Sequence, residues 1–325
     1  MSDLRYPQIN LESKNELAKR ISDRYLPYSE SLKLINDCLE NLDHYWYDSR
    51  ASEPEKEKFV RSARGKPLAE LLKRINLAVL APYDRLVPDF IFGGLSYRNH
   101  VQAAANLLGF QKKRTLLKLD ISRFFERIGD GRIFHFFNKK CGCSVRASRL
   151  LSKICCVPKG PKGSGEVSKT LARGFATSPR LAVWANLDIF LKIDLTVHKM
   201  LRGHDPRLVV FVDDIGISAS RVEMSKMQEV KEKVIDILQN YDPNQTLPVN
   251  QDKTKVIPFQ KIPEHLGIKL GRNKLSPGKK TQLRMKNVSL LLGEAKSKKE
   301  RDRLMIKKQA YRQYKRQLSS VNIPK

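Results

Sequence analysis

Leu208-Val-Val-Phe-Val-Asp-Asp-Ile-Gly-Ile-Ser218 is the stretch that decides the fold. Two apolar, β-prone runs flank the adjacent carboxylates Asp213 and Asp214, which predicts two strands joined by a tight acidic turn. A second acidic strand end lies upstream, where Asp120 closes the apolar run that begins at Leu116. Adjacent like charges cost free energy unless they are solvated or share a cation. Acids are ordinary turn residues, but three carboxylates at two strand ends also predict a site for two Mg²⁺ ions, with Mn²⁺ as an alternative, for in-line phosphoryl transfer.

The composition predicts a polyanionic partner. The chain has 325 residues, with 62 Lys and Arg against 34 Asp and Glu, a formal net charge of +28. Nucleic acid is the leading candidate and an acidic membrane surface the second. No apolar run approaches the roughly 18 residues that span a bilayer, so we expect a soluble cytoplasmic protein without a membrane partner. The spacing of the five cysteines does not fit a zinc site and favours reduced, structural thiols.

The order of the predicted elements indicates an α+β fold. Helical periodicity covers most of residues 1–62, and a strand is expected at 115–121 before a helix-rich stretch. A Gly- and Pro-rich loop at 158–168, a long helix from Ser178 and the acidic strand pair follow. A helix at 223–239, short strands within 249–259 and 265–270, and a basic tail complete the chain. This order predicts a ferredoxin-like βαββαβ antiparallel sheet flanked by helical lobes.

Several motifs in a fixed order resemble those of reverse transcriptases, specifically the bacterial retron-type branch. The resemblance spans about Arg64 to Arg284. The motifs that carry it are Arg64-Gly-Lys-Pro67, Phe92-Gly-Gly-Leu-Ser-Tyr-Arg98, Leu119-Asp-Ile-Ser-Arg-Phe-Phe125, Gly174-Phe-Ala-Thr-Ser-Pro179, Phe211-Val-Asp-Asp214, Asn250-Gln-Asp-Lys-Thr254 and His265-Leu-Gly-Ile268.

The resemblance implies a right-hand polymerase. Its N-terminal helical region and fingers would occupy residues 1–115, its palm residues 116–270 with a fingers-like helical insert at about 126–170, and its short basic helical thumb residues 271–325. The implied activity is that of an RNA-directed DNA polymerase, which copies a non-coding RNA template into DNA from deoxynucleoside triphosphates and holds an RNA–DNA hybrid. The branch implies a role in bacterial antiphage defence, with a toxin or effector protein as a candidate partner.

The resemblance also assigns roles to single residues. Asp120 and Asp213 would bridge both metal ions, Asp214 would support them, and the Ile121 carbonyl would add a hard oxygen ligand. Lys253 would protonate the leaving pyrophosphate, although a solvated strand-end lysine is equally common. Arg64 would contact the incoming triphosphate, Phe125 would lie under its sugar, and Gly174 would let the backbone approach the nascent base pair. The residues implied to contact nucleic acid are Ser178, Pro179, Leu266, Gly267, Lys298, Lys299, Lys307, Lys308 and Arg312.

The chain departs from the family pattern at several places. Arg173 stands where the family has a Gln that touches the incoming nucleotide, and an Arg there could meet a phosphate or stack on a base. Phe211-Val212 replaces the usual Tyr-Ala before the paired acids. These departures keep open the alternative of a non-catalytic RNA-binding scaffold with a retained palm. The chain also has Asn106-Leu-Leu-Gly-Phe110 and His265-Leu-Gly267 where retrons proper carry Asn-Ala-x-x-His and Val-Thr-Gly. A defence-associated or abortive-infection reverse transcriptase of the same branch and a group II intron maturase-like reverse transcriptase are therefore further alternatives. An RNA-templated RNA polymerase is a further alternative, which Phe125 disfavours.

Overall fold

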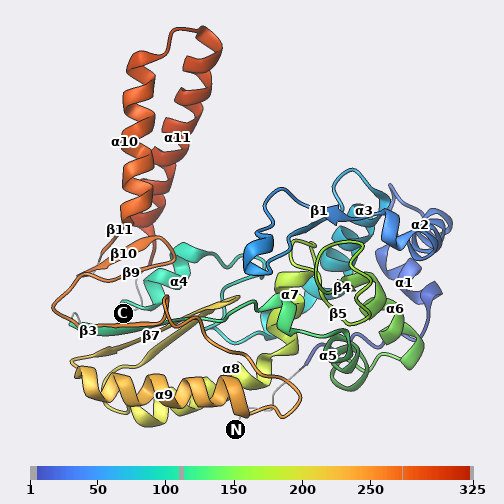
Figure 1. The fold of residues 1–325 in the computed structure, drawn as a ribbon, viewed down its shortest axis with the longest axis horizontal. Coiled ribbons are helices and arrows are strands. Elements are labelled where there is room, and N and C mark those ends of the chain that lie inside the picture. The colour runs from blue at the N-terminus through green and yellow to red at the C-terminus, as the bar shows by residue number, and fades with distance from the viewer. Residues whose placement is uncertain (1–5, 110–112, 273, 323–325) are drawn as a thin grey trace.

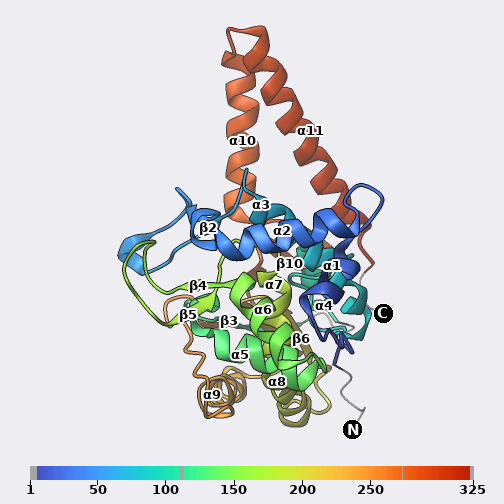
Figure 2. The same cartoon turned by 90° about the vertical axis from the view of Figure 1, so that its right-hand side faces the viewer.

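The computed structural model describes residues 6–109, 113–272 and 274–322. The first and last residues of the predicted domains, 1–5 and 323–325, lie outside these ranges. Helices and antiparallel sheets coexist along the chain, which confirms the predicted α+β class. Figures 1 and 2 show a helical N-terminal part, a sheet with two helices along one face, and a helical hairpin that projects from the rest of the molecule.

The central sheet contains the acidic strands. Its strand order is β6-β7-β3-β8, formed by β6 (Arg207–Phe211), β7 (Asp214–Ser220), β3 (Arg114–Asp120) and β8 (Lys255–Ile257), and each neighbouring pair is antiparallel. Helices α7 (Ser178–Ala185) and α8 (Leu187–Met200) lie between β3 and β6 in the chain, and α9 (Met224–Asn240) lies between β7 and β8. This order follows the βαββαβ pattern expected from the sequence.

Both faces of the sheet are covered, which explains why β7 is buried from Ile215 to Ser220. Helices α8 and α9 cover one face (Figure 1). On the other face, α4 (His100–Asn106) contributes to a second apolar cluster with Leu116 of β3 and Val209 of β6. A strand buried on both faces reads as an apolar run without alternation, as the sequence around the paired acids does.

The N-terminal part consists of helices interrupted by a β-hairpin at residues 47–62. It contains α1 (Lys14–Ile21), α2 (Tyr28–Glu40) and, further on, α3 (Pro67–Arg74). The helical pattern predicted through residue 62 is wrong for residues 47–62, where β1 (Tyr47–Asp48) and β2 (Arg61–Ser62) form a hairpin. A long-range contact fixes this hairpin, because the Arg61 backbone N–H donates to the Arg173 carbonyl at 2.7 Å. The short 3₁₀ and π turns of this part are η1 (Leu42–His44), η2 (Pro54–Lys56), η3 (Ile75–Leu80) and η4 (Ala81–Leu86).

The segment between β3 and α7 packs beside this hairpin. It contains η5 (Phe125–Arg127), α5 (Asp130–His135), η6 (Phe136–Lys140), α6 (Val145–Cys155), β4 (Cys156–Pro158) and β5 (Lys169–Leu171). Strands β4 and β5 pair with each other, and the loop predicted at 158–168 connects them. The five cysteines are buried and unpaired, which confirms the expectation of structural thiols.

A small sheet leads into the C-terminal helices. Strands β9 (Glu264–His265), β10 (Ile268–Gly271) and β11 (Lys274–Pro277) have the order β11-β10-β9. The domain boundary predicted at residue 270 falls inside this sheet. Helices α10 (Lys279–Glu294) and α11 (Lys298–Ser320) follow, which confirms that the basic tail is helical. The end of α11 returns to the body, where Tyr314 stacks on His100 with ring centroids 5.8 Å apart. Among the residues described here, no helix is both long and apolar enough to cross a membrane.

Candidate active site

The three predicted acids lie at one end of the central sheet. Asp120 at the end of β3 pairs in register with Asp214 at the start of β7. Asp213 lies in the turn between β6 and β7, where Phe211 pairs with Asp214. The Ile121 N–H donates to the Asp213 carbonyl at 2.9 Å and ties the strand end to the turn. The sequence prediction that these carboxylates converge is therefore confirmed for the backbone.

Burial makes the charges of the two turn acids unfavourable. Burial, together with the neighbouring charges of Asp213 and Asp120, raises the pKa of Asp214 to about 6. Burial also raises the pKa of Asp213, with the charge of Asp120 adding to it and Arg173 and Lys253 opposing it. A cation close to these buried carboxylates would stabilise their charged form.

The turn that carries Asp213 has an unusual backbone. Val212 has φ +59°, which is rare for a β-branched residue because its side chain crowds the main chain in that region. The Gly93-Gly94 segment packs tightly against this turn, since a Cβ at Gly93 would lie 2.5 Å from the Val212 nitrogen. A Cβ at Gly94 would lie 2.7 Å from the Pro179 carbonyl carbon. The Gly93-Gly94 turn therefore supports the acidic turn from one side and the start of α7 from the other.

Lys253 is held on the Asp120 carboxylate. Its Nζ donates to Asp120 Oδ1 at 2.6 Å, and this hydrogen bond raises the pKa of Lys253. The turn that presents it is anchored to the same strand, because the Asn250 N–H donates to the Asp120 carbonyl at 2.8 Å. Lys253 is therefore held beside the acids by an ion pair, rather than solvated alone at a strand end, and its predicted role as a proton donor stays a prediction.

The chemistry of these side chains suits a divalent cation, since Mg²⁺ prefers carboxylate oxygens. Their present arrangement does not form a finished metal centre. Within the described ranges, no group of three or more His, Cys, Asp or Glu side chains is close enough to hold a metal ion. The Lys253 ammonium binds one of the two carboxylate oxygens of Asp120, Oδ1.

Arg173 lies next to the acids but is bound to another partner. Its Nε and Nη2 donate to the two carboxylate oxygens of Glu126 at 2.8 and 2.9 Å. Its Cζ lies 4.9 Å from the centroid of the Phe125 ring. Burial alone would lower the pKa of Arg173, but Glu126, Asp213 and Asp120 together raise it. Phe124, by contrast, is fully buried in the main core, which is the packing role expected for one of these two rings.

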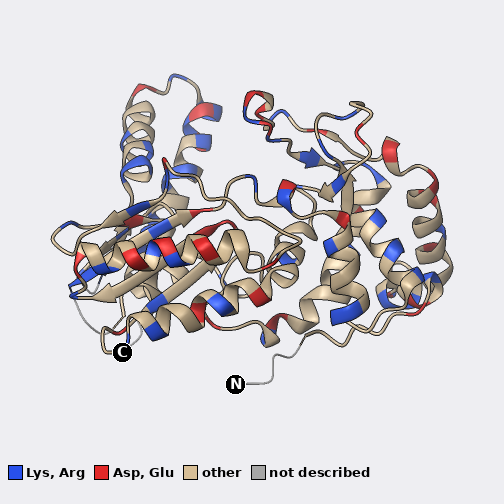
Figure 3. Cartoon of the chain, turned by 60° about the horizontal axis from the view of Figure 1, so that its bottom comes forward, with Lys and Arg blue, Asp and Glu red and all other residues tan. Residues whose placement is uncertain are grey.

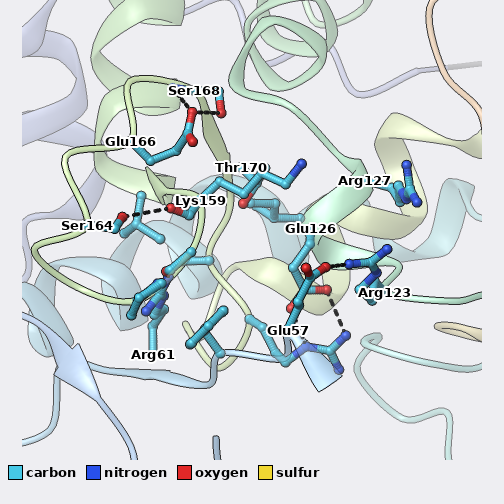
Figure 4. Close-up of a pocket in the computed structure, with 17 residues that line it drawn as sticks. Glu57, Arg61, Arg123, Glu126, Arg127, Lys159, Ser164, Glu166, Ser168 and Thr170 are labelled. Atoms are coloured by element: carbon cyan, nitrogen blue, oxygen red, sulfur yellow. Dashed lines mark hydrogen bonds and ion pairs between the residues drawn. The ribbon is translucent and has the colours of Figure 1, made fainter. Parts of the chain in front are cut away.

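A cavity of about 630 Å³ opens beside Arg173 (Figure 4). Its cationic lining consists of Arg61, Arg123, Arg127, Lys159 and Arg173, and its acidic lining of Glu57, Glu126 and Glu166. Glu57, at the tip of the β1–β2 hairpin, forms an ion pair with Arg123 across this cavity. The hairpin thus closes over the cavity from the N-terminal part of the chain.

The arginine predicted to meet a triphosphate is not the one that the structure places at this cavity. Arg64 is exposed in the turn before α3 and is not among the described residues that line the cavity. Arg61 and Arg123 line it instead. Arg61 is 4% exposed, forms an ion pair with Asp48 and donates to the Pro158 carbonyl at 3.2 Å. Arg123 follows Asp120 by three residues, and this short spacing was the available sequence signal for it.

Two predicted contact residues have structural roles here. Gly174 has φ +101°, and a Cβ there would collide with the Arg61 carbonyl, so the close approach that requires glycine is to the β1–β2 hairpin. Ser178 is fully buried, and its hydroxyl donates to the Ala172 carbonyl at 2.6 Å. The structure therefore places the Ser178 hydroxyl inside the protein, away from any surface ligand.

The remaining predicted contacts lie on the C-terminal part. Leu266 and Gly267, with φ +51° and +72°, form the turn between β9 and β10. The buried His265, which precedes this turn, packs against β7, since a Cβ at Gly216 of β7 would lie 2.8 Å from its ring. Lys298, Lys299, Lys307 and Arg312 are exposed on α11 and Lys308 is half-buried. Figure 3 shows Lys and Arg along both helices of the projecting hairpin.

Comparison with protein families and with curated proteins found no match for the chain. The resemblance to reverse transcriptases therefore depends on the motifs and on the arrangement of their residues in the fold.

Proposed function

We propose that this protein is an RNA-directed DNA polymerase that copies a non-coding RNA template. The observation that carries the proposal is the placement of Asp120, Asp213 and Asp214 at one end of a βαββαβ sheet, with Asp120 and Asp214 in register. In this reading the central sheet is the palm, and the β1–β2 hairpin with the segment between β3 and α7 forms the fingers. The hairpin of α10 and α11 is the thumb.

The acids and Lys253 would share the chemical step. Asp120, Asp213 and the Ile121 carbonyl would hold two Mg²⁺ ions, with Asp214 supporting them. Bound Mg²⁺ supplies activation of the primer 3′-hydroxyl and neutralises the charge of the pyrophosphate. Lys253 would leave Asp120 when this site fills. The pKa of Lys253 is raised on Asp120, so it starts protonated and can give a proton to the leaving pyrophosphate.

The cavity in Figure 4 is the proposed place of the incoming deoxynucleoside triphosphate. Arg123 would exchange its exposed ion pair with Glu57 for the phosphates, which a guanidinium can also bind through two parallel hydrogen bonds. Phe125 would lie under the sugar. The cationic hairpin of α10 and α11 would hold the RNA–DNA hybrid through its phosphates. By the resemblance, the DNA product would act in bacterial antiphage defence with a toxin or effector protein.

Incorporation of labelled deoxynucleotides on a primed RNA template with Mg²⁺ tests the proposal. We expect synthesis by the wild-type protein and none detectable by Asp213→Asn, because one bridging carboxylate is lost while the shape of the side chain is kept. Binding of the template RNA, measured by filter retention, should be nearly the same for both proteins. Asp242→Asn is a matched control, since it alters an acid that pairs with Arg132 away from this site and should retain synthesis. A wild-type protein inactive on its own copurifying RNA and on varied primed templates would contradict the proposal.

A second candidate function is a non-catalytic RNA-binding scaffold. The observation that favours it is the Lys253 ammonium on Asp120, in a site where the described acids do not form a metal-binding group. The two functions differ in what Asp213→Asn does in cells. A scaffold keeps its cellular activity in this variant, whereas a polymerase loses it.

A further inference from the structure

The ion pair between Glu126 and Arg173 is a largely buried polar contact beside the candidate active site. The side chains are only 11% and 15% exposed, and two parallel hydrogen bonds of 2.8 and 2.9 Å join them. The residues lie 47 positions apart, on η5 and on the loop after β5. A two-pronged, largely buried pair of this kind holds a guanidinium in one orientation.

That orientation places the guanidinium on the Phe125 ring. Arg173 Cζ lies 4.9 Å from the ring centroid, within the range of a cation–π contact. Phe125 is 8% exposed and touches Phe124 from the side, with ring centroids 6.0 Å apart. The ring is thus held by the core on one side and by the Arg173 guanidinium on another.

Arg173 has other partners available if Glu126 is lost. The charges of Asp213 and Asp120 already favour its protonated form. Its backbone is fixed, because the Arg173 carbonyl accepts from the Arg61 N–H at 2.7 Å. Without Glu126, the guanidinium would be drawn toward the acids and off the ring, since a buried charge turns to the nearest opposite charge.

We infer that Glu126 and Arg173 are positioning residues that fix the Phe125 ring and so set the selectivity for deoxyribose over ribose. The inference rests on the proposed function, because it concerns the sugar of the nucleotide bound at that site. It assigns to Glu126, which the motif comparison did not single out, control over which class of nucleotide is used.

The experiment compares deoxynucleotide and ribonucleotide incorporation, as a ratio of kcat/KM values on the same primed RNA. We expect this ratio to fall about fivefold in Glu126→Gln and in Arg173→Gln, the equivalent of one cation–π contact of about 1 kcal/mol. The fall should come mainly from better use of ribonucleotides. Arg173→Lys, which keeps a cation near the ring and the acid, should retain most of the selectivity. The selectivity ratio of the double variant should fall no further than that of either single variant, because each single change already breaks the same ion pair.

Asp242→Asn is the matched control, since it breaks the partly buried ion pair with Arg132 elsewhere in the protein and should leave the ratio unchanged. Thermal unfolding confirms that each variant is folded at the assay temperature. An active wild-type protein whose ratio stays the same in Glu126→Gln and Arg173→Gln overturns this inference and leaves the proposed function standing. A ratio that falls equally in Asp242→Asn overturns it too. A wild-type protein that incorporates neither nucleotide overturns the proposed function, and this inference with it.

Discussion

Asp214 carries a charge that the folded protein disfavours. Its pKa rises from 3.8 to about 6, first through burial and then through the charges of Asp213 and Asp120. Between pH 3.8 and about pH 6, Asp214 is protonated in the folded state but ionised in the unfolded state. The contribution of Asp214 to the free energy of unfolding is therefore most favourable at the acidic end of this window and is lost as the pH rises through about 6. At neutral pH the carboxylate is charged, and the folded protein bears this cost. A perturbed pKa of this kind is common at functional sites, although structural ion pairs also produce it.

Asp214→Asn should therefore stabilise the protein above pH 6. We expect a gain on the order of 2 kcal/mol at pH 8, since the neutral amide keeps the shape without the charge, and almost no gain at pH 4. Urea unfolding at the two pH values measures the difference. Asp236→Asn is the control, because Lys233 lowers the pKa of this exposed acid, so its replacement should bring no gain at pH 8. Equal stability of Asp214→Asn and wild type at pH 8 would show that the buried charge is already neutralised.

Among the elements, the hairpin of β6 and β7 depends on the close approach of the Gly93-Gly94 turn. A Cβ at Gly93 would meet backbone atoms, 2.5 Å from the Val212 nitrogen and 2.8 Å from the Phe211 carbonyl carbon. Backbone atoms cannot rotate away as a flexible side chain does. The turn that carries Asp213, with Val212 already at φ +59°, would have to move.

We expect Gly93→Ala to destabilise the protein by at least about 2 kcal/mol, the range of overpacking at a tightly fitted site. Chemical denaturation measures the loss. Gly131→Ala is the matched control, because Gly131 lies in α5 and its added Cβ would meet nothing within 4 Å. There alanine should be neutral or stabilising by up to about 1 kcal/mol, through its helix propensity. A Gly93→Ala protein as stable as wild type would show that the acidic turn is free to shift.

The elements that the sequence predicted well are those with a local signal. Asp120 ends one apolar run, and Asp213 and Asp214 lie between two others, so the ends of these runs predicted the acidic strand ends that the structure pairs. The helix at 223–239 was found within a residue of α9, because its apolar residues recur at helical spacing. The hairpin at 47–62 had no such signal, since its fixing contacts are Arg61 with Arg173 and Asp48 with the loop after β4.

The same distinction separates the site residues that were found from those that were missed. Lys253 lies in the Asn250-Gln-Asp-Lys-Thr254 motif, just before β8, and was found through that motif. Glu126 can be recognised only through its ion pair with Arg173, 47 residues away in the chain. Arg123 had a local signal in its spacing from Asp120, but its ion pair with Glu57 on the distant hairpin did not. Motif comparison favoured Arg64, which lies two residues beyond β2, whereas the chain folds so that Arg61 reaches the cavity. Pairs between residues this far apart in the chain are set by the tertiary structure, so no short stretch of sequence predicts them.

Over the whole molecule, the positive charge is concentrated on the projecting hairpin. Helices α10 and α11 with their connecting turn carry fourteen Lys and Arg against three acids. In the part of the chain that the structure describes, no ion pair neutralises these cations within the hairpin. Helix α9 also carries lysines, but two of them pair with acids, as Lys226 does with Glu229 and Lys233 with Asp236. It lies on the side of the sheet away from α10 and α11 (Figure 1).

This asymmetry predicts which cations bind nucleic acid. Each phosphate contact releases counterions, so the logarithm of the affinity falls with the logarithm of the salt concentration, by about 0.9 per contact on a duplex. Replacing Lys307, Lys308 and Arg312 by Gln should reduce this slope by roughly 2 to 3 for an RNA–DNA hybrid, measured by fluorescence anisotropy over a series of KCl concentrations. The same change at Lys226, Lys231 and Lys233 of α9 removes equal charge from the opposite side and should leave the slope nearly unchanged. If the two triple variants lose the same slope, net charge alone attracts the nucleic acid and α11 has no special contact with it. A loss confined to the α11 variant places the duplex against this helix, on the side of the sheet opposite α8 and α9 (Figure 1).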